Sequence, residues 1–160
     1  MAIEELILVR HADAERDAPS RKDIDRALST LGVSQSEAAA DWLIGHEEHP
    51  VKVLCSPATR AMQTLAAFRA RVPDLAVVEE RGIYEATPGE LISIIDRHRP
   101  ISSLMIVGHN PGLETLMTLL ADGRSTDGRG MPTASIARLR LPAGKALEPG
   151  CAELIDFWWP

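Results

Sequence analysis

Four short apolar runs recur along the chain, and polar residues follow each of them. They are residues 5–10 (ELILVR), 51–55 (VKVLC), 75–79 (LAVVE) and 104–108 (LMIVG). Continuous apolar runs of this length are typical of strands that are buried on both faces of a mainly parallel sheet. Two further segments read as strands: residues 134–141 (ASIARLRL), which alternate and so predict one wetter face, and residues 153–158 (ELIDFW).

Helical patterns lie between these runs. Ser34 and Glu37 have the spacing of a capping box before AAADWLI, and Gly45 is a plausible stop. Three dipeptides place a good N-cap residue before a proline at the first helical position: Ser56-Pro57, Thr87-Pro88 and Asn110-Pro111. Strands that alternate with helices predict an α/β fold, a three-layer α/β/α sandwich around a mostly parallel sheet. Residues 12–30 and 122–133 read as loops.

Length and charge limit the number of domains and the kinds of partner that we expect. We expect residues 1–160 to form one domain, since this length suits a single core. The net charge is −6, and residues 1–50 carry 5 Lys and Arg against 11 Asp and Glu. This balance argues against a nucleic-acid partner, and no apolar run approaches the roughly 20 residues that span a membrane. Two cysteines and no signal-peptide pattern lead us to expect a reducing cytoplasm.

Polar groups gather at the ends of three predicted strands. Arg10-His11 closes the first, Ser56 to Arg60 (SPATR) follows the second, and Gly108 to Pro111 (GHNP) follows the fourth. The carboxyl ends of parallel strands meet at one edge of a sheet, and ligands bind there. Two of these segments also begin helices, whose N-termini favour anions. Two arginines and two histidines therefore predict a site for a phosphoryl group, because guanidinium forks match its oxygens in pairs.

The residue types limit the chemistry at such a site. There is no Mg²⁺-type carboxylate cluster and no GxxxxGK[ST] motif, and Cys55 lacks the Cys-x5-Arg loop of cysteine phosphatases. His46 and His49 flank two glutamates, but Pro50 stands where an HExxH motif needs its second histidine, so we expect no metal site. A histidine remains as the covalent catalyst. Flanking cations would hold its imidazole neutral, and the arginines would stabilise the charged oxygens during transfer.

Four segments carry a resemblance to a known family: LILVRHADAE (6–15), ALSTLG (27–32), CSPATRAMQTL (55–65) and VGHNPGLETL (107–116). In this order they resemble the histidine phosphatase superfamily, with its phosphoglycerate-mutase-like fold. The short chain is similar to the SixA-type phosphohistidine phosphatases, which lack the large insertions of other members. The resemblance implies that His11 is the phosphorylated nucleophile and that Arg10, Arg60 and His109 form the phosphate pocket. Ala12 stands where the superfamily usually has glycine.

The proton donor is left open by this comparison. Mutase-like members place a glutamate in the loop after the third strand, and Glu85 falls at about that point. Asp13, two residues after the nucleophile, is its rival. Solvent is the third candidate, because a P–N bond to imidazole breaks readily once the leaving ring is protonated, whereas an alkoxide needs a positioned acid.

The sequence therefore predicts a metal-independent phosphatase, without a cofactor, that hydrolyses phosphohistidine on proteins through a covalent phosphohistidine intermediate. The partner would be a phosphorylated protein, such as a histidine-containing phosphotransfer domain. Two alternatives stay open: a small-molecule phosphomonoesterase of the same superfamily, and a catalytically weak phosphate-binding module that docks a phosphorylated partner. A binding module has no need of a histidine in the nucleophile position, which favours catalysis.

Overall fold

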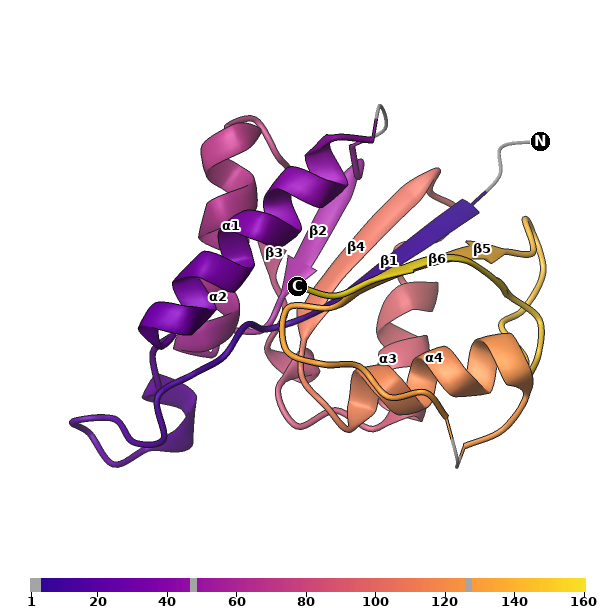
Figure 1. The fold of residues 1–160 in the computed structure, drawn as a ribbon. Coiled ribbons are helices and arrows are strands. Elements are labelled where there is room, and N and C mark those ends of the chain that lie inside the picture. Colours follow the sequence, from indigo (N-terminus) through magenta and orange to yellow (C-terminus); the bar gives the residue numbers. More distant parts are fainter. Residues whose placement is uncertain (1–3, 47–48, 126–127) are drawn as a thin grey trace.

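A computed structural model describes residues 4–46, 49–125 and 128–160, and these build a sheet between two pairs of helices (Figure 1). The strand order is β3-β2-β4-β1-β5-β6. The strands are β1 (Glu4–Arg10), β2 (Lys52–Cys55), β3 (Val77–Glu79), β4 (Ser103–Gly108), β5 (Ile136–Leu141) and β6 (Glu153–Trp158). All six coincide with predicted strands to within two residues at either end.

The sheet is parallel where the polar strand ends gather. β1 pairs with β4, β4 with β2, and β2 with β3, all in parallel, whereas β5 and β6 run antiparallel at one side. Arg10 lies opposite Gly108, and Cys55 lies opposite Val107. The segments that follow β1, β2 and β4 therefore leave the sheet at the same edge, as the sequence predicts.

Helices cover both faces of this sheet, which confirms the three-layer sandwich (Figure 1). α1 (Thr30–Ile44) and α2 (Thr59–Arg71) lie on one face, and α3 (Pro88–Asp96) and α4 (Gly112–Asp122) lie on the other. Alternate residues of β1 serve the two sides: Ile7 and Val9 pack in the core of α1 and α2, while Leu6 and Leu8 pack in the core of α3 and α4. This double burial explains why the strands are apolar runs without alternation. Short 3₁₀ turns η1 (Asp23–Asp25) and η2 (Arg81–Ile83) precede α1 and α3.

Two predicted helix starts need correction because their polar residues serve another purpose. α2 begins at Thr59, three residues after Ser56, and Ala58 is its N-cap. α4 begins at Gly112, with Pro111 at the N-cap position. The side chain of Ser56 is engaged with His109, so it belongs to the strand-end cluster instead of capping α2.

The predicted capping box at Ser34 and Glu37 is also wrong, since both residues lie inside α1. The helix starts at Thr30, where the Ser29 hydroxyl accepts the amide of Gly32 at 3.0 Å. A cap one turn upstream was available, and the helix extends to it. The cap at Thr87 is confirmed, with a reciprocal capping box to Glu90. Within the described residues, no helix is long and apolar enough to cross a membrane.

Candidate active site

His11 lies immediately after β1 and is 8% exposed. Its backbone amide donates to Gly108 O at 3.0 Å, and its carbonyl accepts the amide of Ala134 at 3.1 Å, so the residue is fixed between β4 and the approach to β5. Its Nδ1 lies 2.7 Å from the carbonyl oxygen of Ala12. A carbonyl only accepts, so Nδ1 carries the proton and donates it. The lone pair of the neutral ring is therefore on Nε2.

The pKa of His11 is lowered from 6.5 to about 4, chiefly by burial and also by the charges of Arg60 and Arg10, while the Ala12 hydrogen bond acts in the opposite direction. The imidazole is thus neutral at pH 7, as a nucleophile must be. The sequence analysis attributed this neutrality to the flanking cations, whereas burial is the larger cause.

Ala12 fits the position that usually holds glycine in the family. It is fully buried, and it is not among the described residues with positive φ, so its methyl group causes no left-handed strain. Its amide donates to Thr64 Oγ1 at 2.9 Å, and that hydroxyl donates to Arg60 O at 2.8 Å. These bonds tie the turn after His11 to the first turns of α2.

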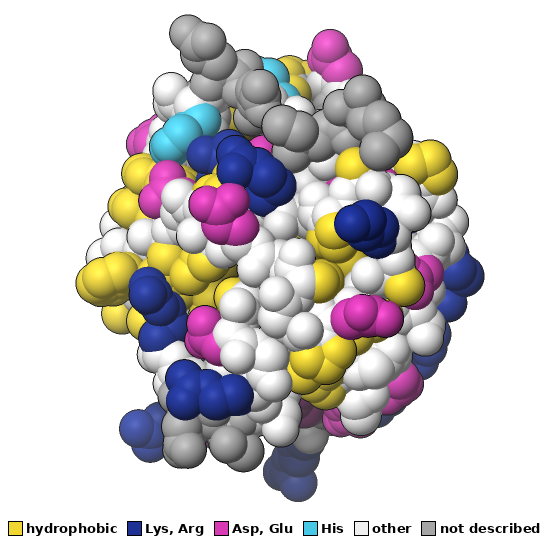
Figure 2. Space-filling model, turned by 90° about the vertical axis from the view of Figure 1, so that its right-hand side faces the viewer, with side chains coloured by type: hydrophobic (Ala, Val, Ile, Leu, Met, Phe, Trp, Pro, Cys, Tyr) yellow, Lys and Arg dark blue, Asp and Glu magenta, His cyan; other side chains and the backbone are white. Residues whose placement is uncertain are grey.

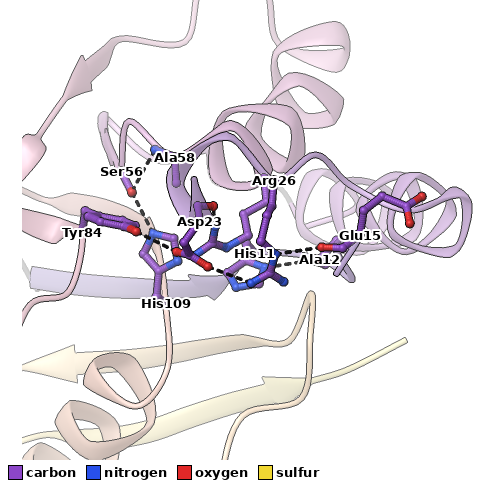
Figure 3. A network of polar contacts seen from close by, with 10 residues as sticks. His11, Ala12, Glu15, Asp23, Arg26, Ser56, Ala58, Tyr84 and His109 are labelled. Carbon is purple, nitrogen blue, oxygen red and sulfur yellow. Dashed lines mark hydrogen bonds and ion pairs between the residues drawn. The ribbon is translucent and has the colours of Figure 1, made fainter. Parts of the chain in front are cut away.

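His109 follows β4 and faces His11, with 5.2 Å between the ring centroids (Figure 3). Its Nε2 lies 2.8 Å from Ser56 Oγ, which already accepts the Ala58 amide at 3.2 Å. We assign the tautomer in which the Ser56 hydroxyl donates to Nε2, which puts the proton of the neutral ring on Nδ1. Burial, followed by the smaller effects of His11 and Arg60, lowers the pKa of His109 from 6.5 to about 3, so this ring is also neutral at pH 7.

Two guanidinium groups join the histidines, that of Arg60 buried and that of Arg10 half-buried. Arg60, in the first turn of α2, is 6% exposed and donates from Nη1 to Asp23 O at 2.7 Å and from Nη2 to Asp23 Oδ2 at 2.9 Å. Arg10, at the end of β1, donates from Nη1 to Met131 O at 2.9 Å. Both arginines contribute to the electrostatic lowering of the His11 pKa, so both charges act at the nucleophile.

Three of these residues hold buried hydrogen-bond donors without an acceptor. Within the described residues, four buried side-chain nitrogen or oxygen atoms have no partner, and three of them are Arg10 Nε, Arg60 Nε and His109 Nδ1. Unpaired buried polar groups are rare and costly, so each needs an explanation. Anions with several oxygens accept from donors of this kind, and a phosphoryl group has that shape and charge.

Comparison with known proteins decides the family. The model of the histidine phosphatase superfamily (branch 1) matches residues 6–99. The chain belongs to the histidine phosphatase superfamily. Phosphohistidine phosphatase SixA of Escherichia coli K12 is 30% identical over 129 residues, covering 76% of each chain. Rv1276c of Mycobacterium tuberculosis H37Rv, described as uncharacterized, is 38% identical over 147 residues, covering 86% of this chain and 91% of that protein.

Solved structures agree with this assignment. The protein histidine phosphatase SixA complexed with tungstate has a TM-score of 0.81 at 25% identity and covers 98% of this chain and 97% of that one. A protein of Agrobacterium tumefaciens described as a candidate phosphohistidine phosphatase SixA has a TM-score of 0.83 at 28% identity, with 98% of both chains covered. The SixA-type resemblance and the compact fold are confirmed, and the chain is a phosphatase.

Asp23 belongs to the site of this histidine phosphatase, although the sequence analysis did not predict it there. Its carboxylate accepts from Tyr84 Oη at 2.6 Å and from Arg60, and its other oxygen accepts from Arg26 Nη1 at 2.8 Å (Figure 3). The Tyr84 hydrogen bond, followed by those of Arg26 and Arg60, holds the pKa of Asp23 well below its usual range. No periodic pattern marks Asp23, because its partners come from 37 and 61 positions further along the chain.

Glu85 lies on an exposed loop beside the site of this histidine phosphatase. It lines a cleft of about 440 Å³ together with Arg60 and His109. Its φ of 59° is left-handed, an uncommon conformation for glutamate that marks a constrained loop. A Cβ on Gly112 would lie 2.5 Å from Ala86 O, so glycine at that position lets the Glu85 loop approach the start of α4.

Asp13 is bonded to the start of α1. Its Oδ2 accepts from the Ser29 hydroxyl at 2.6 Å, and its carbonyl accepts the Ser29 amide at 3.0 Å, so it fastens the start of α1. The structure therefore places Glu85, but not Asp13, on the cleft of the site.

Cys55 and the candidate metal ligands play no visible part in the site. Cys55 is buried at the end of β2, and burial raises the pKa of its thiol to about 12, which excludes a thiolate nucleophile. The described residues hold no group of three or more His, Cys, Asp or Glu that could bind a metal. Of the segment between His46 and His49, Glu47 and Glu48 lie outside the described residues.

Proposed function

We propose that this phosphatase hydrolyses phosphohistidine on proteins through a covalent phosphohistidine at His11. The observation that carries the proposal is the pairing of a neutral, buried His11, whose Nδ1 proton is committed to Ala12, with three unpartnered buried donors on Arg10, Arg60 and His109. A phosphate-binding module would need the donors but not the oriented imidazole. The name of the E. coli relative, phosphohistidine phosphatase SixA, supports the same reaction.

In the first step, the Nε2 lone pair of His11 attacks phosphorus. The P–N bond of the substrate breaks, its electron pair stays on the leaving imidazole nitrogen, and that nitrogen takes a proton from the solvent or from Glu85. Arg10, Arg60 and the Nδ1–H of His109 stabilise the charge on the three equatorial oxygens. The ring of His11 becomes cationic on phosphorylation, and its Nδ1–H bond to the Ala12 carbonyl stabilises that charge.

In the second step, a water molecule attacks the phosphorus on His11. A new O–P bond forms while the P–Nε2 bond breaks, and the electron pair returns to Nε2. The water loses one proton to the solvent or to a nearby carboxylate, and inorganic phosphate leaves. His11 is then neutral again, with its proton still on Nδ1.

The position of the carboxylates favours substrates with easily displaced leaving groups. Asp13 is committed to Ser29. Glu85 is exposed on the cleft, and no hydrogen bond within the described residues orients its side chain toward His11. A P–N bond or an aryl ester tolerates a weakly positioned acid, whereas an alkyl ester loses roughly 10²–10⁴-fold without one. Phosphohistidine therefore suits this site better than the phosphate ester of an alcohol.

A comparison of kcat/KM across four substrates tests the proposal: a phosphohistidine protein, free phosphohistidine, an aryl phosphate and 3-phosphoglycerate. We expect the protein to rank first, because docking supplies binding energy away from the reacting centre, and 3-phosphoglycerate to rank last. If 3-phosphoglycerate is the better substrate by tenfold or more, the small-molecule phosphomonoesterase replaces the proposal. Tight phosphate binding without turnover of any of the four would identify a binding module.

A further inference from the structure

A second hollow lies beside the catalytic cleft, in the loop between β1 and α1. It has a volume of about 610 Å³ and is lined by residues 16–19 and 21–23 together with Arg26, and we call it the loop pocket. Asp23 belongs to both hollows, so they share a wall. Figure 3 shows Asp23 and Arg26 in the same polar network as His11 and His109. A group bound in the loop pocket would therefore be a near neighbour of the reacting phosphoryl.

The loop pocket is cationic. Arg16, Arg21, Lys22 and Arg26 line it, against the carboxylates of Asp17 and Asp23. The Asp23 carboxylate is already occupied by Arg60, Arg26 and Tyr84. The side chains of Arg16, Arg21 and Lys22 are exposed, and within the described residues they form no hydrogen bond or ion pair. The pocket thus offers more unpaired positive than negative charge.

The net charge of the loop pocket is opposite in sign to that of the segment that contains it. Residues 1–50 contain five Lys and Arg against 11 Asp and Glu. Four of those five line the loop pocket, and the fifth is Arg10 of the catalytic site. Figure 2 shows a different face of the molecule, on which cationic and anionic side chains are interspersed. A local concentration of one sign attracts an opposite charge and raises its encounter rate.

Hydrogen bonds order the backbone of the loop that carries these cations. The Glu15 amide donates to Ala27 O at 2.8 Å, and Arg26 Nε donates to Glu15 O at 2.8 Å, so the two arms of the loop are joined at its base. Near the tip, the Arg21 amide donates to Ala18 O at 2.9 Å. Because the loop is already ordered, a ligand would lose little binding energy to ordering it.

We propose that the loop pocket docks an acidic segment of the phosphorylated protein substrate, next to the phosphohistidine. The inference rests on the proposed function for the identity of the phosphoryl group, and on the loop pocket alone for the acidic neighbour. Glutamate or aspartate side chains within a few residues of the phosphohistidine pair with Arg16 and Lys22 while the phosphoryl group occupies the cleft. The docking surface thus selects protein substrates by charge.

Binding of an acidic peptide without any phosphoryl group tests the docking surface by itself. The probe is a fluorescein-labelled octapeptide of alternating serine and glutamate, measured by anisotropy at low ionic strength. We expect the Arg16→Glu/Lys22→Glu double variant to bind it at least about tenfold more weakly than wild type, and we expect added salt to weaken wild-type binding. The kcat for an aryl phosphate should change far less than octapeptide binding in this variant, because neither residue lines the catalytic cleft.

Lys145→Glu is the matched control. Lys145 is equally exposed, but it follows β5 at the opposite end of the sheet from His11, where Leu141 pairs with Glu4. An equal loss in Lys145→Glu, or no loss in the double variant, would overturn the inference. Succinate binding as tightly as the octapeptide would also overturn it, since the pocket would then be a subsite for small anions.

Turnover separates this inference from the proposed function. The substrates are two phosphohistidine peptides, one with glutamates and one with glutamines on both sides of the phosphohistidine. A preference of wild type for the acidic peptide that disappears in the double variant supports the docking surface. Equal rates on both peptides overturn it and leave the proposed function intact. Pocket-dependent binding of the octapeptide with no turnover of either phosphohistidine peptide would retain the docking surface and refute the proposed function.

Discussion

Arg60→Lys tests whether the fork of a guanidinium, rather than a positive charge alone, is needed at the phosphoryl site. Arg60 is 6% exposed, both of its terminal nitrogens are bonded to Asp23, and its Nε is a buried donor without an acceptor. A lysine keeps the charge, but its three donors sit on one nitrogen, so it cannot reproduce the planar fork that spans Asp23 and a phosphoryl oxygen. A lost hydrogen bond to a charged group costs about 1.5–3 kcal/mol. The upper part of that range corresponds to roughly 10²-fold in rate.

The same helix supplies a matched control. Arg71 donates from Nε to Asp41 Oδ1 at 2.7 Å and from Nη1 to Ala67 O at 2.9 Å, but it lies at the far end of α2 from the site. The assay is kcat/KM on an aryl phosphate, with the inhibition constant of inorganic phosphate and the Tm of each variant. We expect Arg60→Lys to lose about 10²-fold in kcat/KM and to bind phosphate more weakly, and Arg71→Lys to stay within about twofold of wild type. If the two variants have equal kcat/KM and equal phosphate affinity, Arg60 does not bind the phosphoryl group.

Chelators should leave turnover unchanged, since the phosphoryl charge is met by arginine and histidine; a loss in chelator that Mg²⁺ or Zn²⁺ restores would contradict the proposed site. The ring resonances of His11 and His109 should titrate near pH 4 and pH 3 in NMR spectra, and a midpoint at 6.5 would refute their burial as the cause of neutrality. Because the unfolded chain takes up these protons first, the free energy of unfolding should fall as pH drops below 6.5 toward 4. Glu85→Gln should slow alkyl phosphates more than phosphohistidine, and equal slowing of both would exclude Glu85 as the proton donor.

The sequence predicts the catalytic cluster because short-range patterns determine it. Apolar runs identify parallel strands, parallel strands end at one edge, and Arg10, His11, Arg60 and His109 all follow such ends. The convergence of these residues needs only the direction of the strands, not the details of packing. Helix starts are harder to predict, because Ser56 could cap α2 or bind His109, and only the folded site shows that it binds His109.

Contacts between a loop and distant elements could not be predicted in this way. Asp23 meets Arg60 and Tyr84 because the loop after β1 folds back over the start of α2, and no periodicity encodes that path. Similarly, Arg10 is bonded to the carbonyl of Met131, which lies 121 positions further along the chain in a segment predicted only as loop. The sequence did contain one signal for the loop pocket, the clustering of Lys and Arg within an otherwise acidic segment.

The covalent intermediate on His11 is the central claim, and trapping it is the most direct test. Wild-type protein is mixed with a ³²P-labelled phosphohistidine protein or aryl phosphate, quenched in base within the first turnover, and digested for mapping of the label. The account predicts an acid-labile, base-stable phosphoryl group on the peptide that contains His11, and none on the same peptide of a folded His11→Asn variant. Label on another residue, or turnover by His11→Ala within tenfold of wild type, would contradict the account.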